Sequence, residues 1–324
     1  MQNQPDPLVQ LAPRGAPGAA APETSVRKPG WLKVKAPGGA AFVEVRRLMR
    51  DLELHTVCEA AHCPNVGECW SHRAATFMIL GDVCTRNCGY CAIAHGTPRP
   101  LDVEEPRRLA EAVLAMRLRH VVVTSVDRDD LPNGGAEQFA GVVREIRQRM
   151  AGTTVEVLIP DFTGSEAALR IVVDARPDIL NHNIETVPRL YRVARPGGRY
   201  DRALELLARA KRMDPLLVTK SGIMVGLGET WEEALAALRD LRAAGADLVT
   251  IGQYLRPSSG HMPVARFYSP EEFAELRRLG DDLGFRHVES GPLVRSSYHA
   301  WEQAERAVDG ATGAKSPRTL KLLL

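Results

Sequence analysis

Residues 76–91 read TFMILGDVCTRNCGYC, an apolar run that leads directly into three closely spaced cysteines. The run at 76–80 has the character of a buried strand, so the loop after it carries the cysteines. These are Cys84, Cys88 and Cys91, in a CxxxCxxC spacing. Three thiolates can hold three irons of a cubane cluster and leave the fourth iron open, whereas electron-transfer clusters close with a fourth cysteine. An open iron implies a bound substrate or cofactor.

Short apolar, β-branched runs continue to alternate with stretches of helical period along the chain. The expected strands are Thr76–Leu80, Val121–Val126, Val155–Pro160, Ile179–Glu185, Val218–Val225 and Leu248–Leu255. Strict alternation of strand and helix implies an α/β fold with parallel strands and right-handed crossovers, either an open sheet or a curved, partial barrel. Ligand sites in such folds gather at the carboxyl ends of the strands, so function is expected in the loops there.

Several helices carry clear sequence markers. Apolar residues recur at helical spacing after the second strand, which predicts a helix with one buried stripe. These residues are Phe139, Val142, Val143, Ile146 and Met150. Thr230 with Glu233, and Ser269 with Glu272, have the spacing of capping boxes. Gly245 and Gly284 suit helix ends.

Composition excludes several classes of protein. Forty-two basic against forty acidic residues give a net charge of +2, which offers no broad basic surface for nucleic acid. No apolar run approaches the roughly 20 residues that span a bilayer, and the first residues lack the order of a secretory signal. We therefore expect a cytoplasmic protein that binds neither nucleic acid nor membrane. Disordered tails are expected at residues 1–27 and at the C-terminus (315–324), which are non-periodic.

All six cysteines lie between Cys58 and Cys91. Cytosolic thiols are kept reduced, so such a cluster more often holds metal than forms disulfides. Cys58, Cys63 and Cys69 form a second, rarer CxxxxCxxxxxC triad. A structural zinc site completed by His95 is the alternative for the first triad, and two zinc sites would make the chain an interaction or nucleic-acid-binding module.

The first triad, with an aromatic Tyr90 before its last cysteine, resembles the signature of the radical SAM superfamily. The segment from Leu54 to Trp70, together with the motif at 81–88 and GPLVRSSYHA at 291–300, resembles lipoyl synthases. The resemblance covers residues 28–300. It implies that the open iron chelates S-adenosylmethionine (SAM), which is cleaved to a 5'-deoxyadenosyl radical.

The same resemblance implies a second 4Fe-4S cluster, which is the family's sulfur source. Cys58, Cys63 and Cys69 would hold it, and a serine of RSSY, assigned as Ser297, would be the fourth ligand. Read alone, Ser296 and Ser297 would be turn residues. An alkoxide is a poorer partner for iron in a sulfur-rich cluster than a thiolate, so this corner is expected to be labile.

Polar residues after later strands are candidates for the SAM pocket. Gly134 and Gly135 allow close approach of the backbone to a ligand, although Ala136 stands where many radical SAM enzymes have a glutamate. Asn183 and Glu185 could bond the ribose hydroxyls, and Arg195 could pair with the methionyl carboxylate. A cluster of hydrogen bonds at a strand end and a solvated charge are the respective alternatives.

The resemblance divides the chain into an auxiliary-cluster segment (28–75), a partial (β/α)6 barrel of the radical SAM type (76–290) and a C-terminal segment with the serine ligand (291–324). It implies insertion of two sulfur atoms at C6 and C8 of a protein-bound octanoyl-lysine, with two SAM consumed. Expected partners are the octanoylated lipoyl carrier domains of 2-oxoacid dehydrogenase complexes, the glycine cleavage H protein, and an electron donor such as flavodoxin or ferredoxin. A methylthiotransferase or a biotin synthase relative is the alternative enzyme.

Overall fold

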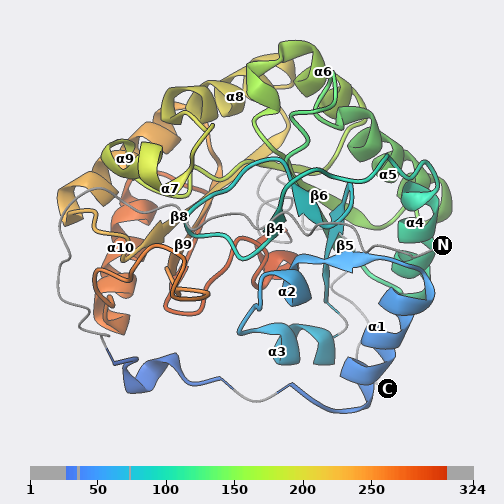
Figure 1. Ribbon diagram of the computed structural model, residues 1–324. Helices are drawn as coiled ribbons and strands as arrows, with labels where there is room; N and C mark the ends of the chain where they lie inside the picture. The colour runs from blue at the N-terminus through green and yellow to red at the C-terminus, as the bar shows by residue number, and fades with distance from the viewer. Residues whose placement is uncertain (1–26, 35–36, 73, 305–324) are drawn as a thin grey trace, which may run out of the picture.

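The computed structural model describes residues 27–34, 37–72 and 74–304 (Figure 1). Apart from Arg27, the two tails expected at 1–27 and 315–324 lie outside the described residues. Within the described part, no helix is both long enough and apolar enough to cross a membrane.

The centre of the molecule is a sheet of eight strands in the order β1-β2-β5-β6-β7-β8-β9-β10. Neighbours from β2 to β10 pair in parallel, whereas β1 runs antiparallel on the outer edge of β2. The strands are β1 (His55–Thr56), β2 (Thr76–Ile79), β5 (His120–Ser125), β6 (Thr154–Leu158), β7 (Ile179–Asn181), β8 (Val218–Val225), β9 (Leu248–Gln253) and β10 (His287–Gly291). Since β1 and β10 are the two edges of this order, the barrel is open.

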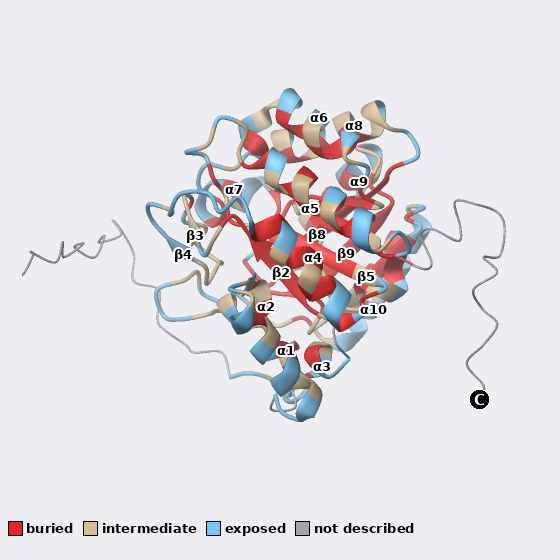
Figure 2. Ribbon diagram, turned by 90° about the vertical axis from the view of Figure 1, so that its right-hand side faces the viewer, coloured by how far each residue is buried: buried red, intermediate tan, exposed pale blue. Residues whose placement is uncertain are grey.

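Helices connect the parallel strands and cover the outside of the sheet, as the outer arc in Figure 1 shows. They are α4 (Glu105–Met116), α5 (Ala136–Arg149), α6 (Glu166–Asp174), α7 (Pro188–Ala194), α8 (Tyr200–Met213), α9 (Trp231–Ala243) and α10 (Pro270–Asp282). Each of the longer helices turns one apolar stripe to the strands and leaves its other face exposed (Figure 2). This arrangement confirms the predicted partial barrel.

The predicted helix signals act as expected. Both capping boxes are formed, by Thr230 with Glu233 at the start of α9 and by Ser269 with Glu272 at the start of α10. The stripe predicted around Phe139 is buried along α5. Gly245 follows the end of α9 with a φ of 90°, a left-handed conformation that glycine adopts at little cost.

Six strands were predicted, and the structure adds others. β10 is a seventh parallel strand, whose sequence HVESG is too polar for the apolar pattern to reveal it. β3 (Val83–Cys84) and β4 (Ala94–His95) pair separately beside the barrel. β7 ends at Asn181, four residues before its predicted end. Glu185, which takes a φ of 68°, still forms an isolated parallel bridge to Ile223 of β8.

The N-terminal and C-terminal segments meet at the open side of the barrel. η1 (Gly30–Leu32), α1 (Ala40–Asp51), α2 (Val57–Ala60) and α3 (Val66–Ser71) precede β2. The Asn65 side-chain amide donates a 2.7 Å hydrogen bond to the Leu293 carbonyl and thereby joins the two segments. Further along, Ala304 packs in one apolar cluster with Ile179, Val218 and Leu248, the first residues of β7, β8 and β9. The described chain therefore ends against the amino ends of the barrel strands.

Candidate active site

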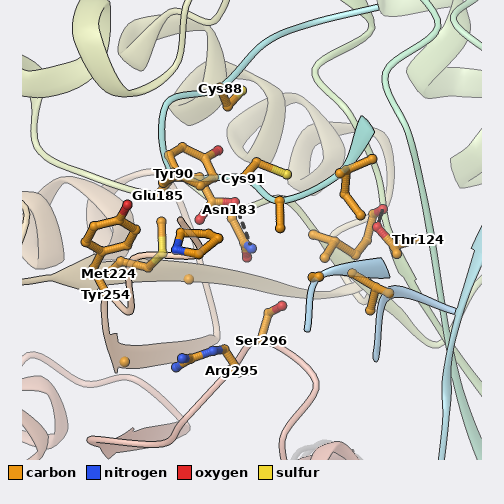
Figure 3. Close-up of a pocket in the computed structure, with 18 of the residues that line it drawn as sticks. Cys88, Tyr90, Cys91, Thr124, Asn183, Glu185, Met224, Tyr254, Arg295 and Ser296 are labelled. Carbon is orange, nitrogen blue, oxygen red and sulfur yellow. Dashed lines mark hydrogen bonds between the residues drawn. The ribbon is translucent and has the colours of Figure 1, made fainter. Parts of the chain in front are cut away.

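A cavity of about 540 Å³ lies at the carboxyl ends of the barrel strands. Residues from most parallel strands and from both terminal segments line it, and several point toward one another in Figure 3. Its size is ordinary for a small-molecule or cofactor site. The three cysteines of the CxxxCxxC motif, Cys84, Cys88 and Cys91, all border it.

Short-range hydrogen bonds shape the cysteine loop. Cys84 ends β3, and the Cys91 amide donates a 3.1 Å hydrogen bond to the Cys88 carbonyl, which closes a turn. The amide of Gly89, within that turn, donates a hydrogen bond to the carbonyl of Ala194, the last residue of α7, and the carbonyl of Gly89 accepts one from the amide of Met262 after β9. His95 is exposed on β4 and is not one of the described residues that line the cavity. The histidine of the zinc alternative therefore does not join the thiols at the cavity.

Arg86 anchors this loop from the inside. Its buried guanidinium donates to Asp129 at 2.6 Å and to Asp161 at 2.7 Å, so the loop is tied to the segments after β5 and β6. Charge-assisted bonds of this geometry are among the strongest that side chains make. Sequence reasoning missed Arg86, because its partners lie 43 and 75 residues away and nothing local marks an arginine between cysteines as buried.

Burial favours the protonated form of the thiols in this loop. Burial raises the pKa of Cys88 to about 12 and that of Cys91 to about 11. All six cysteines are free of disulfides. Among the described residues, no three His, Cys, Asp or Glu side chains are close enough together to hold a single metal ion, and each triad instead borders a pocket. Cysteines ligate metal as thiolates, so loading either triad would release protons.

The predicted polar residues of the SAM pocket converge beside these thiols (Figure 3). The Asn183 amide donates to a Glu185 carboxylate oxygen at 3.1 Å, and Arg195 donates to the Asn183 carbonyl at 2.7 Å. Burial raises the pKa of Glu185, and Tyr90 also lines the cavity. The buried Oδ1 atom of Asn183 has no hydrogen-bond partner among the described residues, whereas Oδ1 of Asp127 lies 3.4 Å from Nη1 of Arg86 in an ion pair. Three thiols without disulfides and an amide oxygen without a hydrogen-bond partner, around one cavity, fit an iron-sulfur cluster with a polar cofactor.

Gly134 and Gly135 do not belong to the described residues that line this cavity. Both have left-handed φ angles, 61° and 86°, just before α5. A Cβ at Gly134 would lie 2.9 Å from the Phe162 ring, and one at Gly135 would collide with the Leu80 side chain. Backbone conformation and close packing account for these glycines, and their contact with SAM stays a prediction.

The second triad surrounds a smaller pocket, of about 40 Å³. Cys58 lies in α2, Cys63 follows it, and Cys69 lies in α3. Burial, together with the charge of neighbouring thiolates, raises the pKa of Cys58 to about 11 and that of Cys69 to about 12. Three free thiols on one small pocket fit the same kind of group as the first triad.

Ser297 borders this smaller pocket, whereas Ser296 borders only the larger cavity. The Thr76 hydroxyl, at the start of β2, donates to the Ser297 hydroxyl at 2.7 Å. Thr76, Arg295 and Ser297 line both pockets, so the two thiol sites share a wall.

The chain matches two protein-family models. Residues 78–241 match the radical SAM superfamily, and residues 19–63 match the N-terminal domain of lipoyl synthase of the radical SAM family. The chain is 59% identical to a lipoyl synthase of Rubrobacter xylanophilus, and the match covers 89% of this chain and 90% of that protein. It is 60% identical to a lipoyl synthase of Symbiobacterium thermophilum, with the same shares covered.

Solved structures share the fold at much lower identity. The structure of HydG, a maturase of the FeFe-hydrogenase, superposes with a TM-score of 0.53 at 16% identity and covers 74% of this chain and 68% of that one. Methylornithine synthase superposes with a TM-score of 0.50 at 17% identity, covering 69% of this chain and 73% of that chain.

Proposed function

The chain belongs to the lipoyl synthase family of radical SAM enzymes, and from this premise we propose that its two cysteine triads hold two iron-sulfur clusters with different tasks. Cys84, Cys88 and Cys91 hold the 4Fe-4S cluster that binds SAM. Cys58, Cys63 and Cys69, with Ser297, hold the auxiliary cluster. When bound, these groups supply the 5'-deoxyadenosyl radical and the sulfur that is inserted at C6 and C8 of an octanoyl chain.

The proposal rests on one observation: the two thiol pockets share a wall. C6 and C8 of an octanoyl chain are unactivated, so the same short stretch of acyl chain must reach the hydrogen-abstracting site and the sulfur site. Two adjoining pockets that share Thr76, Arg295 and Ser297 in their linings meet this need without release of the chain.

The residues around the larger cavity divide into polar and apolar groups. Arg195 and Asn183 lie where they could orient the methionyl and ribose groups of SAM. Apolar side chains that line the same cavity, among them Met78 and Leu158, suit an alkyl chain and would exclude water from a radical. The substrate is an octanoylated lipoyl carrier protein. Which carriers are used, and whether flavodoxin or ferredoxin supplies the electrons, follow from the family as part of this proposal.

Single-turnover analysis of an octanoylated carrier by mass tests the division of tasks. Alanine at Cys84, Cys88 or Cys91 should abolish production of 5'-deoxyadenosine while iron remains on the other triad. Alanine at Cys58 or Cys69 should leave 5'-deoxyadenosine production intact and remove lipoyl product. Lipoyl product from a second-triad variant, or parent-level 5'-deoxyadenosine from a first-triad variant, would contradict the assignment.

A further inference from the structure

Arg295, in the segment after β10, is a cation without a carboxylate partner among the described residues. Its Nη1 atom donates a 2.7 Å hydrogen bond to the Val294 carbonyl, and no ion pair joins its guanidinium to the part of the chain that the structure describes. Arg86, by contrast, has three carboxylates around it. A guanidinium stays protonated in proteins, and a charge away from bulk water is costly unless an opposite charge lies nearby. The positive charge of Arg295 therefore calls for an anion.

The fold places this charge in the wall between the two thiol pockets. Arg295 lines both the larger cavity and the pocket of the second triad, whereas Figure 3 shows it well apart from Cys88 and Cys91 of the first triad. A Cβ at Gly252, in β9, would lie 2.2 Å from the Val294 carbonyl oxygen that accepts the arginine's hydrogen bond. The glycine thus lets the segment with Arg295 approach the end of the barrel strands closely.

The backbone on both sides of Arg295 is held in place. The Leu293 carbonyl accepts a hydrogen bond from Asn65, and the Arg295 carbonyl accepts one of 2.9 Å from the Tyr298 amide. Cys63 is the thiol whose charge acts on this side chain. Burial lowers the pKa of Arg295 and the Cys63 thiolate opposes this, while burial raises the pKa of Cys63 and Arg295 opposes that. The guanidinium and the second triad therefore lie within electrostatic reach of each other.

We propose that Arg295 is the counter-charge of the auxiliary cluster, and that the anion it pairs with is the group held by Cys58, Cys63 and Cys69. The inference rests on the proposed function, in which this triad holds a cluster. Three thiolates and the Ser297 alkoxide bring more negative charge than an iron-sulfur core offsets, so the bound group is an anion. A cation nearby favours the more negative, reduced form and raises the reduction potential. Since Arg295 stands in the shared wall, its charge acts where the acyl chain has to meet the sulfur.

The test isolates the auxiliary cluster in a variant with alanine at Cys84, Cys88 and Cys91, loaded anaerobically with iron and sulfide. Iron and sulfide content and the midpoint potential, from a redox titration followed by EPR, are measured. Arg295→Met keeps a long side chain without its charge and should disfavour reduction about tenfold, a shift of about 59 mV to a more negative potential for one electron. Arg295→Lys retains the charge and should recover most of this shift.

Arg256→Met in the same background is the matched control. The Arg256 guanidinium also donates to backbone carbonyls, those of Ser259 and His261, and pairs with no carboxylate of the described residues. It lines the larger cavity but not the pocket of the second triad. Its loss should leave the potential of the auxiliary cluster at the parent value.

An unchanged potential in Arg295→Met at parent iron and sulfide content would overturn the inference alone, and so would an equal shift in Arg295→Lys or in Arg256→Met. A triple-alanine protein that binds no iron and sulfide would instead overturn the proposed function. If Arg295→Met does not load, the loading of Arg295→Lys decides. Parent content in the lysine variant supports the inference, whereas loss of loading there as well refutes it, because the pocket would then require the shape of the side chain rather than its charge.

Discussion

Gly222, in the middle of β8, offers a sharp test of the SAM pocket. It lines the larger cavity, and a Cβ at this position would lie 2.7 Å from the Thr250 hydroxyl and 2.8 Å from Asn183 Oδ1. Carbon and oxygen atoms that are not bonded normally approach to about 3.3 Å. The new Cβ of Gly222→Ala would therefore lie about 0.5 Å too close to each of these two oxygen atoms. Thr250 is buried, and the Asn183 side chain is therefore the part that must turn.

Turning Asn183 breaks its 3.1 Å hydrogen bond to Glu185 and moves the amide away from its place at the cavity. Overpacking of this kind typically costs about 1–3 kcal/mol, which corresponds to about 5- to 150-fold in affinity. We expect SAM to bind more weakly to Gly222→Ala by a factor in this range, with a parallel loss of 5'-deoxyadenosine. Equilibrium dialysis of SAM with the anaerobically loaded protein measures this.

Gly141→Ala is the matched control. Its Cβ would lie 3.4 Å from the Pro106 ring, an ordinary contact, within α5. SAM affinity should not change, and the melting temperature should stay equal or rise, because alanine favours helix over glycine by about 1 kcal/mol. Parent-level SAM binding in both Gly222→Ala and Asn183→Ala would refute the reasoning, since Asn183 would then have no part in holding SAM.

Three further outcomes are expected from the same structure. Arg86→Met should lower stability by about 3 kcal/mol, because buried Asp161 then keeps only Arg202 and the carboxylates of Asp127 and Asp129 lose their ion pair with Arg86. An unchanged anaerobic melting temperature would contradict this. Ser297→Ala should keep iron near the parent content yet reduce sulfur transfer, and Ser297→Cys should hold the auxiliary cluster but resist its opening; lipoyl formation by both at the parent rate would make Ser297 a turn residue. Burial and Arg195 lower the pKa of His182 to about 3 in the folded chain. As the pH falls below about 6.5, His182 therefore binds a proton in the unfolded chain but not in the folded one. At pH 5.5 the free energy of unfolding should be about 1.4 kcal/mol lower than at neutral pH because of this proton. The melting temperature should fall accordingly, and His182→Asn should not show this part of the fall.

Much of the barrel could be predicted because its strands are short apolar runs and its helices carry local caps. β10 was missed because HVESG gains its strand conformation from pairing with β9 rather than from its own pattern. The cysteines were found because spacing along the chain marks them. Arg86 was missed because its role depends on partners that only the folded chain brings together.

The open side of the barrel has a consequence of its own. Thr76 on β2 and the segment after β10 meet there, and the auxiliary thiols lie in the seam between them. In a closed barrel, ladder hydrogen bonds between the first and last strands would occupy this space. The pocket of the second cysteine triad thus occupies the gap that further strands would fill in a closed barrel. We expect that a change that brings β10 nearer to β2 would close the pocket of Cys58, Cys63 and Cys69 before it disturbs the CxxxCxxC loop, which lies beyond the carboxyl end of β2.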